Sequence, residues 1–109
     1  MYPLSKQDTF VSNLDRLREV APEIATAFRG LRVATDAYGS LEPMQRELIM
    51  LAGFAATRNE GGFRVHCTRA AEAGAGLQDV EQTVLLLLGT SLGLFPVVEA
   101  LGWAREELT

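Results

Sequence analysis

The spacing of apolar residues predicts helices along the whole chain. A first helix, capped by Ser5, ends before Pro22, and Pro22 opens a second helix that continues to about Ala37. Both carry apolar side chains at intervals of three or four residues, the spacing of one helix face. The residues with this spacing are Phe10, Leu14, Leu17, Ile24, Phe28 and Leu31. Because no stretch of useful length alternates between apolar and polar residues, we expect no strands.

Two helices in the middle of the chain are expected to form the hairpin around which the rest is organised. Residues 43–58 are apolar on almost every side after Glu47, which predicts a buried helix. Residues 63–73 predict a second helix, with His66 on its inward face. The short glycine-containing segment 59–62 joins them, so we expect the two helices to pack as an antiparallel pair.

Two further helices are expected after the hairpin. One runs from about Gln78 to Leu88, and the last carries Pro96 in its first turn. The sequence therefore predicts an all-α fold of about five or six helices. We expect one domain over residues 1–109, with N-terminal helices in residues 1–38 and the core in residues 43–108.

Composition narrows the class of protein. A helical chain of 109 residues with 48% hydrophobic residues can form a core, and it is small enough to complete its burial by association. A net charge of −4 and a pI near 4.9 give no electrostatic footprint for nucleic acid or an anionic membrane. The single cysteine cannot form an internal disulfide, and residues 1–6 lack the apolar region of a signal peptide, so we expect a cytoplasmic location. The longest uncharged run, 82–98, is shorter than the roughly 20 apolar residues that span a bilayer.

Glu47 and His66 are the residues that suggest chemistry. His66 is the only histidine, and in an antiparallel hairpin its side chain can meet Glu47 across the helix interface. A carboxylate that accepts a hydrogen bond from an imidazole fixes its tautomer and raises its basicity, which is the minimal apparatus of a general acid/base. The same pair can instead be a satisfied buried contact that holds two helices in register.

Four other features of the sequence could indicate a site. Residues 89–93 match the G-x-S-x-G nucleophile elbow by letter, but that fold needs a longer chain and a histidine after the serine, whereas His66 precedes Ser91. Cys67 is expected to be a packed core thiol, with a reactive thiolate as the alternative. One histidine and one glutamate are too few donors for a metal, and the only lysine, Lys6, is terminal. We therefore expect no metal and no cofactor.

Several stretches of this chain are shared with one family. They are Arg46-Glu47-Leu48-Ile49, His66 nineteen residues after Glu47, Ala70 to Gly74, Leu77 to Glu81, and Gly93 to Pro96 followed by Ala100-Leu101. Through them, residues 16–108 resemble the carboxymuconolactone decarboxylase-like family, which also includes the AhpD-type alkylhydroperoxidases. In the peroxidase branch a Cys-x-x-Cys pair lies seven and four residues before the histidine. Those positions here are Asn59 and Gly62, so the glutamate and histidine common to both branches are what remains.

The resemblance implies a homo-oligomer, commonly a trimer or hexamer, with sites near subunit contacts. It also implies a cofactor-free acid/base enzyme of decarboxylase or isomerase type that acts on a small carboxylated lactone or keto acid. His66 would deliver or take the proton, and Glu47 would orient and charge-balance the imidazole. An arginine would hold the substrate carboxylate, and Arg46 and Arg69 are the candidates. The alternative interpretation is that the arginines of this region are solvated surface charges. These arginines are Arg46, Arg58, Arg64 and Arg69.

Two other classes of function remain open. An AhpD-like antioxidant protein would have to use Cys67, the one thiol, and to resolve it through another molecule. A non-catalytic oligomeric binding protein would keep the helices and use Glu47 and His66 for structure alone. These classes differ in whether His66 can meet a substrate or is sealed in the core.

Overall fold

The structure, a computed structural model, describes residues 6–109, with side chains from residue 13 onward, and contains six helices and no strand within that range. The predicted all-α class is confirmed. The helices are α1 (Lys6–Val20), α2 (Pro22–Ala37), α3 (Pro43–Ala56), α4 (Glu60–Glu72), α5 (Leu77–Leu85) and α6 (Leu94–Leu108). No helix among the described residues has the length and apolarity to cross a membrane. The chain divides into two compact units, Met1–Leu41 and Glu42–Thr109, and a single domain over the whole chain stays a prediction.

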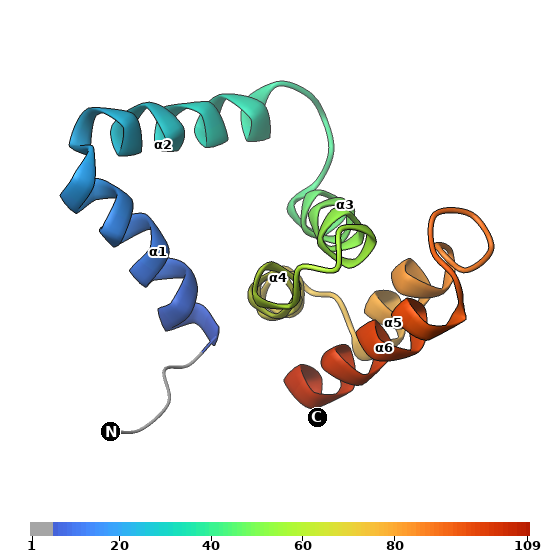
Figure 1. Ribbon diagram of the computed structural model, residues 1–109. Coiled ribbons are helices and arrows are strands. Elements are labelled where there is room, and N and C mark those ends of the chain that lie inside the picture. The colour runs from blue at the N-terminus through green and yellow to red at the C-terminus, as the bar shows by residue number, and fades with distance from the viewer. Residues whose placement is uncertain (1–5) are drawn as a thin grey trace. The chain divides into compact units, whose positions relative to one another are not determined.

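The first unit consists of α1 and α2, which meet at a corner at Ala21 and diverge from it (Figure 1). Pro22 occupies the first turn of α2, as predicted, whereas the predicted cap at Ser5 lies outside the described residues. Ala25 is the one buried side chain of α2. The predicted apolar stripe of α2 is exposed to solvent, with 61% of Ile24 and 58% of Leu31 accessible.

The second unit packs the α3–α4 hairpin against α5 and α6 (Figure 1). Its core draws on all four helices, and Phe63 of α4 meets Trp103 of α6 edge to face at 5.6 Å between ring centroids. On α3, Leu51 and Ala55 are buried, but 58% of Ile49 is exposed. The prediction that α3 is buried on almost every side is therefore wrong, because this unit covers one face of the helix.

The turn between α3 and α4 is shorter than predicted, and it ends before the two glycines. Arg58 turns the chain with a left-handed φ of 58°. Asn59 then caps α4, because its side-chain Oδ1 accepts a hydrogen bond from the backbone N–H of Gly62 at 2.9 Å. Helix α4 therefore begins at Glu60 rather than at Phe63, and both glycines lie in its first turn.

The segment between α5 and α6 is a hydrogen-bonded turn. Helix α5 ends at Leu85, three residues earlier than predicted, and the backbone N–H of Ser91 donates to the carbonyl of Leu87 at 3.0 Å. Gly89 takes a φ of 79°, which favours glycine. Ser91 follows no strand here, so the elbow interpretation fails on structure as well as on chain length. Helix α6 begins at Leu94, with Pro96 in its first turn as predicted.

Candidate active site

Glu47 and His66 come from facing helices of the hairpin. Glu47 lies one turn into α3, which is capped at its start by the backbone N–H of Glu42 donating to Gln45 Oε1 at 2.9 Å. His66 lies on α4, on the face that carries the buried Phe63 and Ala70. The three-residue turn lets the two helices pack side by side, which brings the two polar side chains to the same level of the hairpin.

The predicted contact between Glu47 and His66 is present. His66 Nδ1 lies 2.6 Å from Glu47 Oε2, a short hydrogen bond in which Nδ1–H donates to the carboxylate. Donation from Nδ1 leaves Nε2 as the basic nitrogen of a neutral imidazole. The pair can therefore hold a proton in a defined place.

The two members of the pair differ in their access to solvent. The His66 side chain is 6% exposed, whereas the Glu47 side chain is 18% exposed. The Phe54 ring lies against the imidazole, and a charge interaction is stronger beside apolar groups than in water. The imidazole is therefore nearly sealed within the subunit, and the carboxylate is the more accessible member of the pair.

Phe54 is part of the site, although sequence reasoning did not select it. Its ring stacks on the His66 imidazole, with centroids 5.1 Å apart and planes inclined by 28°. Phe54 follows Glu47 by seven residues, which is two helical turns, so both side chains lie on the α3 face that meets α4. That spacing is the signal that would have found it.

Arg46 and Arg69, the two predicted substrate-binding residues, are half-buried on α3 and α4. Arg46 adjoins Glu47 in the chain, and Arg69 follows His66 by three residues on the same side of α4. Arg69 also lies in the last turn of α4, where a cation is favourable near the helix carboxyl end. A role in substrate binding stays a prediction for both.

Arg64 corrects the expectation that the arginines are all solvated. Its side chain is only 12% exposed, and Nη1 lies 3.0 Å from Oε1 of Glu107 on α6. It also pairs with Glu60 at 2.8 Å and with Glu106 at 3.3 Å. Burial alone would lower the pKa of Arg64, but the hydrogen bonds to these carboxylates outweigh it and raise the pKa. Arg58, in contrast, is 60% exposed, as expected.

Cys67 is a core residue, as predicted from its place on α4. It is fully buried, within the apolar cluster formed by α3 to α6. Burial raises the pKa of the Cys67 thiol to about 12, the charge of Glu107 adds to the rise, and Arg64 opposes it. Because the thiolate is the reactive form of cysteine, the sulfur of the folded chain is chemically inert near neutral pH.

Metal-binding groups are sparse in the described part of the chain. No three histidine, cysteine, aspartate or glutamate side chains among those residues gather closely enough to hold an ion. The chemistry that this arrangement offers is proton transfer at the Glu47–His66 pair.

Comparison with known proteins identifies the class that this fold and site define. The model of the carboxymuconolactone decarboxylase family matches residues 22–106, a range that contains both Glu47 and His66. The chain belongs to the carboxymuconolactone decarboxylase family. No curated protein matches it.

A solved structure has the same fold. It is the crystal structure of an apo carboxymuconolactone decarboxylase family protein from Legionella pneumophila, with a TM-score of 0.79 and 22% sequence identity. The match covers 94% of this chain and 89% of that chain. At this identity the comparison establishes the fold alone.

Proposed function

We propose that the protein is a cofactor-free acid/base enzyme of decarboxylase or isomerase type, acting on a small carboxylated lactone or keto acid. The observation that carries the proposal is the 2.6 Å hydrogen bond between His66 Nδ1 and Glu47 Oε2, which joins α4 to α3. Membership of the carboxymuconolactone decarboxylase family supports it. A carboxylate that holds an imidazole by a hydrogen bond places a proton donor or acceptor at a fixed position, which general acid/base catalysis requires.

The proton transfer follows from the geometry of the pair. Glu47 accepts from Nδ1–H, so Nε2 is the imidazole atom that exchanges a proton with the substrate. When His66 takes up a proton, the adjacent carboxylate balances the new charge. When His66 releases that proton, the hydrogen bond to Glu47 keeps the remaining proton on Nδ1. His66 is thus the acid or base, and Glu47 orients it.

In a decarboxylation, the bond between the carboxylate carbon and the neighbouring carbon breaks, and carbon dioxide leaves. The electron pair stays on the substrate as an enolate, which the adjacent carbonyl delocalises. Protonated His66 then donates from Nε2 to carbon, and the imidazole regains its proton from water. In an isomerisation the same nitrogen takes a proton from one carbon and returns it to another. In both reactions Arg46 or Arg69 would hold the substrate carboxylate through its planar guanidinium.

Sulfur chemistry of the AhpD type is disfavoured by two observations. The positions that carry the cysteine pair in the peroxidase branch are Asn59 and Gly62. The remaining thiol, Cys67, is fully buried and has a pKa of about 12, so it is neither accessible nor ionised near neutrality.

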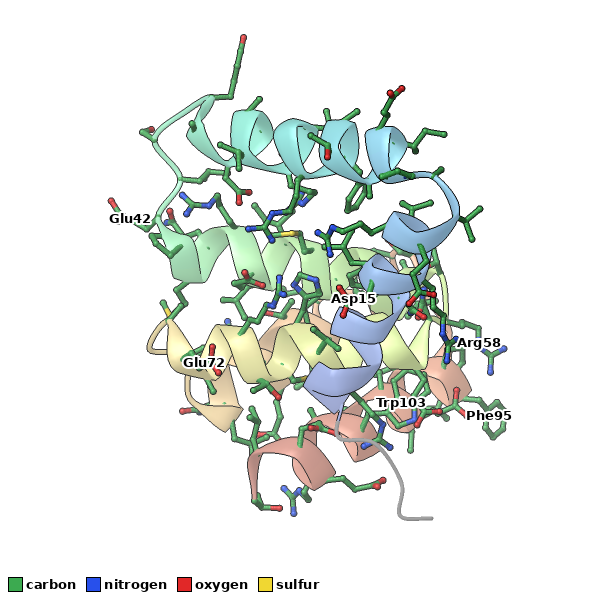
Figure 2. All side chains as sticks on the ribbon, turned by 90° about the vertical axis from the view of Figure 1, so that its left-hand side faces the viewer. Asp15, Glu42, Arg58, Glu72, Phe95 and Trp103 are labelled. Atoms are coloured by element: carbon green, nitrogen blue, oxygen red, sulfur yellow. The ribbon has the colours of Figure 1, made fainter. Side chains whose placement is uncertain are left out.

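We also propose that the subunits associate into a homotrimer or homohexamer in the cytoplasm. Large apolar side chains at the start of α6 support association, since Leu94 is 59%, Phe95 84% and Val98 55% exposed. The side chain of Phe95 projects away from the helix (Figure 2). Burial of this surface against further copies would remove it from water.

The proposal is tested with a panel of carboxylated lactones and β-keto acids, with carbon dioxide release and proton exchange as readouts. Glu47→Gln keeps the size and hydrogen-bonding capacity of the side chain but removes its charge, so we expect turnover to fall while the fold is retained. Glu99→Gln is the matched control, because it makes the same change on α6 at a side chain that is 48% exposed. Equal turnover in wild type, Glu47→Gln and Glu99→Gln would assign the pair to structure, as in a non-catalytic binding protein.

A further inference from the structure

Phe54 lies directly on the backbone of Gly62. A Cβ atom built at Gly62 would lie 2.4 Å from both Cδ1 and Cε1 of the Phe54 ring, and 2.8 Å from Cγ. Contacts under 3.0 Å do not occur between real Cβ atoms and other heavy atoms, so no residue with a side chain fits at position 62 while the ring stays where it is. The glycine is needed for the close approach of the ring rather than for its backbone freedom.

The same ring contacts the imidazole of the proposed site. Phe54 stacks on His66 with centroids 5.1 Å apart, and His66 follows Gly62 by four residues, one turn along α4. The Phe54 ring therefore rests on the backbone of Gly62 and covers one face of the His66 imidazole. Glu47 binds the same imidazole at Nδ1, at the ring edge. Two partners on α3 therefore restrict the imidazole in different directions, one through hydrogen bonding and one through packing.

We infer that Phe54, seated on Gly62, is a positioning residue for His66 that keeps the imidazole turned toward Glu47. A histidine side chain has two rotatable bonds, and a hydrogen bond at one ring atom leaves the ring free to tilt about that atom. A ring stacked on the imidazole, with the two planes inclined by 28°, restricts this freedom, because further tilting would break the stacked contact. This inference rests on the proposed acid/base function of His66 and names a further residue that the function requires.

The inference also relates Phe54 to the missing cysteine at position 62. The Cβ of a cysteine there would lie 2.4 Å from Cδ1 and Cε1 of Phe54, so a thiol at position 62 requires the ring to move. The ring occupies the space next to the imidazole that a side chain at position 62 would take. Phe54 and Gly62 therefore form an aromatic contact that a side chain at position 62 would displace.

The experiment uses the single histidine as a reporter. In the 15N-labelled protein, the Nδ1–H proton of His66 gives one imidazole signal, shifted to low field by the hydrogen bond to Glu47. Two variants disrupt the stacking of Phe54 on His66. Phe54→Leu removes the aromatic ring, and Gly62→Ala displaces the ring through the added Cβ. We expect the signal to weaken through faster exchange with water, and to move upfield, in both variants. We expect Phe54→Tyr to keep it, because the ring remains.

Gly61→Ala is the matched control. It makes the same change one residue earlier in α4, where the added Cβ meets only Asn59 Oδ1 at 3.8 Å, an ordinary contact. We expect it to keep the wild-type imidazole signal and the wild-type midpoint of thermal unfolding. Gly62→Ala should lower that midpoint, and it should stop doing so in a Phe54→Ala background, where the clash is gone.

Turnover provides the second readout. If His66 is the acid or base, Phe54→Leu should lower kcat at least tenfold with little change in KM, and Phe54→Tyr should restore it. The inference is wrong if Phe54→Leu folds and retains both the low-field imidazole signal and kcat of the wild type. If Gly62→Ala does not fold, Phe54→Leu alone tests whether Phe54 positions His66. Unchanged turnover in His66→Gln would instead refute the proposed function, and the imidazole signal would still show whether Phe54 positions the ring.

Discussion

Arg64 on α4 and Glu107 on α6 form a nearly buried ion pair between two helices that are far apart along the chain. Nη1 of the arginine lies 3.0 Å from Oε1 of the glutamate, and the side chains are 12% and 5% exposed. The two residues are separated by 43 positions. The pair therefore fixes the last turn of α6 on the helix that carries His66.

Arg64→Met should destabilise the fold strongly. It removes the guanidinium from a carboxylate that remains almost fully buried, and breaking such a pair typically costs about 3–5 kcal/mol. The free energy of unfolding in urea measures the effect. Arg58→Met is the matched control, because Arg58 is 60% exposed and its contact with Glu99 is 3.4 Å long, so a loss of about 0–1 kcal/mol is expected there. Equal losses in the two variants would show that burial of the pair has no energetic consequence.

The helical fold and the central contact were predictable from sequence for the same physical reason. Apolar residues at helical spacing define which faces turn inward, and the polar residues on those faces must meet partners there. His66 is the only histidine, and Glu47 is the polar exception on an apolar helix. A hairpin of the two helices therefore predicts that their side chains meet.

Other features depend on tertiary contacts that local pattern does not encode. Adjacent glycines such as Gly61 and Gly62 predict a turn because they usually break helices, whereas the Asn59 cap places both in the first turn of α4. The leucine run from Leu85 to Leu88 has no periodicity, so the sequence does not locate the end of α5. The local sequence predicts a surface charge at Arg64, because its partner Glu107 lies on another helix.

The thiol of Cys67 should be protected in the folded protein. It is fully buried and its pKa is about 12, so an alkylating reagent at pH 7 should modify it only after denaturant is added. Cys67→Ala should keep turnover on any substrate of the wild type and should abolish no peroxide-dependent activity. Rapid alkylation without denaturant, or a peroxidase activity that depends on Cys67, would favour the antioxidant class.

The same thiol makes stability depend on pH in alkaline solution. An unfolded cysteine ionises near its ordinary pKa of about 8.5, whereas burial raises the pKa of folded Cys67 to about 12. Between these values the unfolded state binds fewer protons than the folded state, so the free energy of unfolding falls as pH rises. Cys67→Ala should show a shallower fall over this range in urea unfolding. Parallel curves for wild type and variant would contradict the raised pKa.

Association should depend on the exposed aromatic at the start of α6. Phe95→Asp places a charge where 84% of the phenylalanine is accessible in the subunit, so it should reduce the assembled mass without affecting the fold. Sedimentation at micromolar concentration measures the mass. Gln78→Asp is the control, because it adds the same charge at an exposed polar position on α5 and should leave assembly intact. A wild-type protein that sediments as a folded monomer of 11.9 kDa would contradict the proposed oligomer.

The relative effects of changing Glu47 and His66 should assign their roles. Glu47→Gln should lose less turnover than His66→Gln if the glutamate chiefly orients the imidazole, since an amide oxygen still accepts from Nδ1–H. A larger loss in Glu47→Gln would make the carboxylate itself the proton carrier. The comparison is informative because Glu47 is the more exposed member of the pair.

The most direct test of proton transfer at the pair is kcat of His66→Gln on a carboxylated lactone or β-keto acid that the wild type turns over. Glutamine keeps polarity and approximate size but cannot relay a proton at neutral pH, so the variant should fold and assemble as the wild type does. Loss of general acid/base catalysis typically costs roughly 10²–10⁴-fold in rate, and a decrease in kcat of that size is the predicted result. Full wild-type turnover in a folded His66→Gln protein would contradict the account.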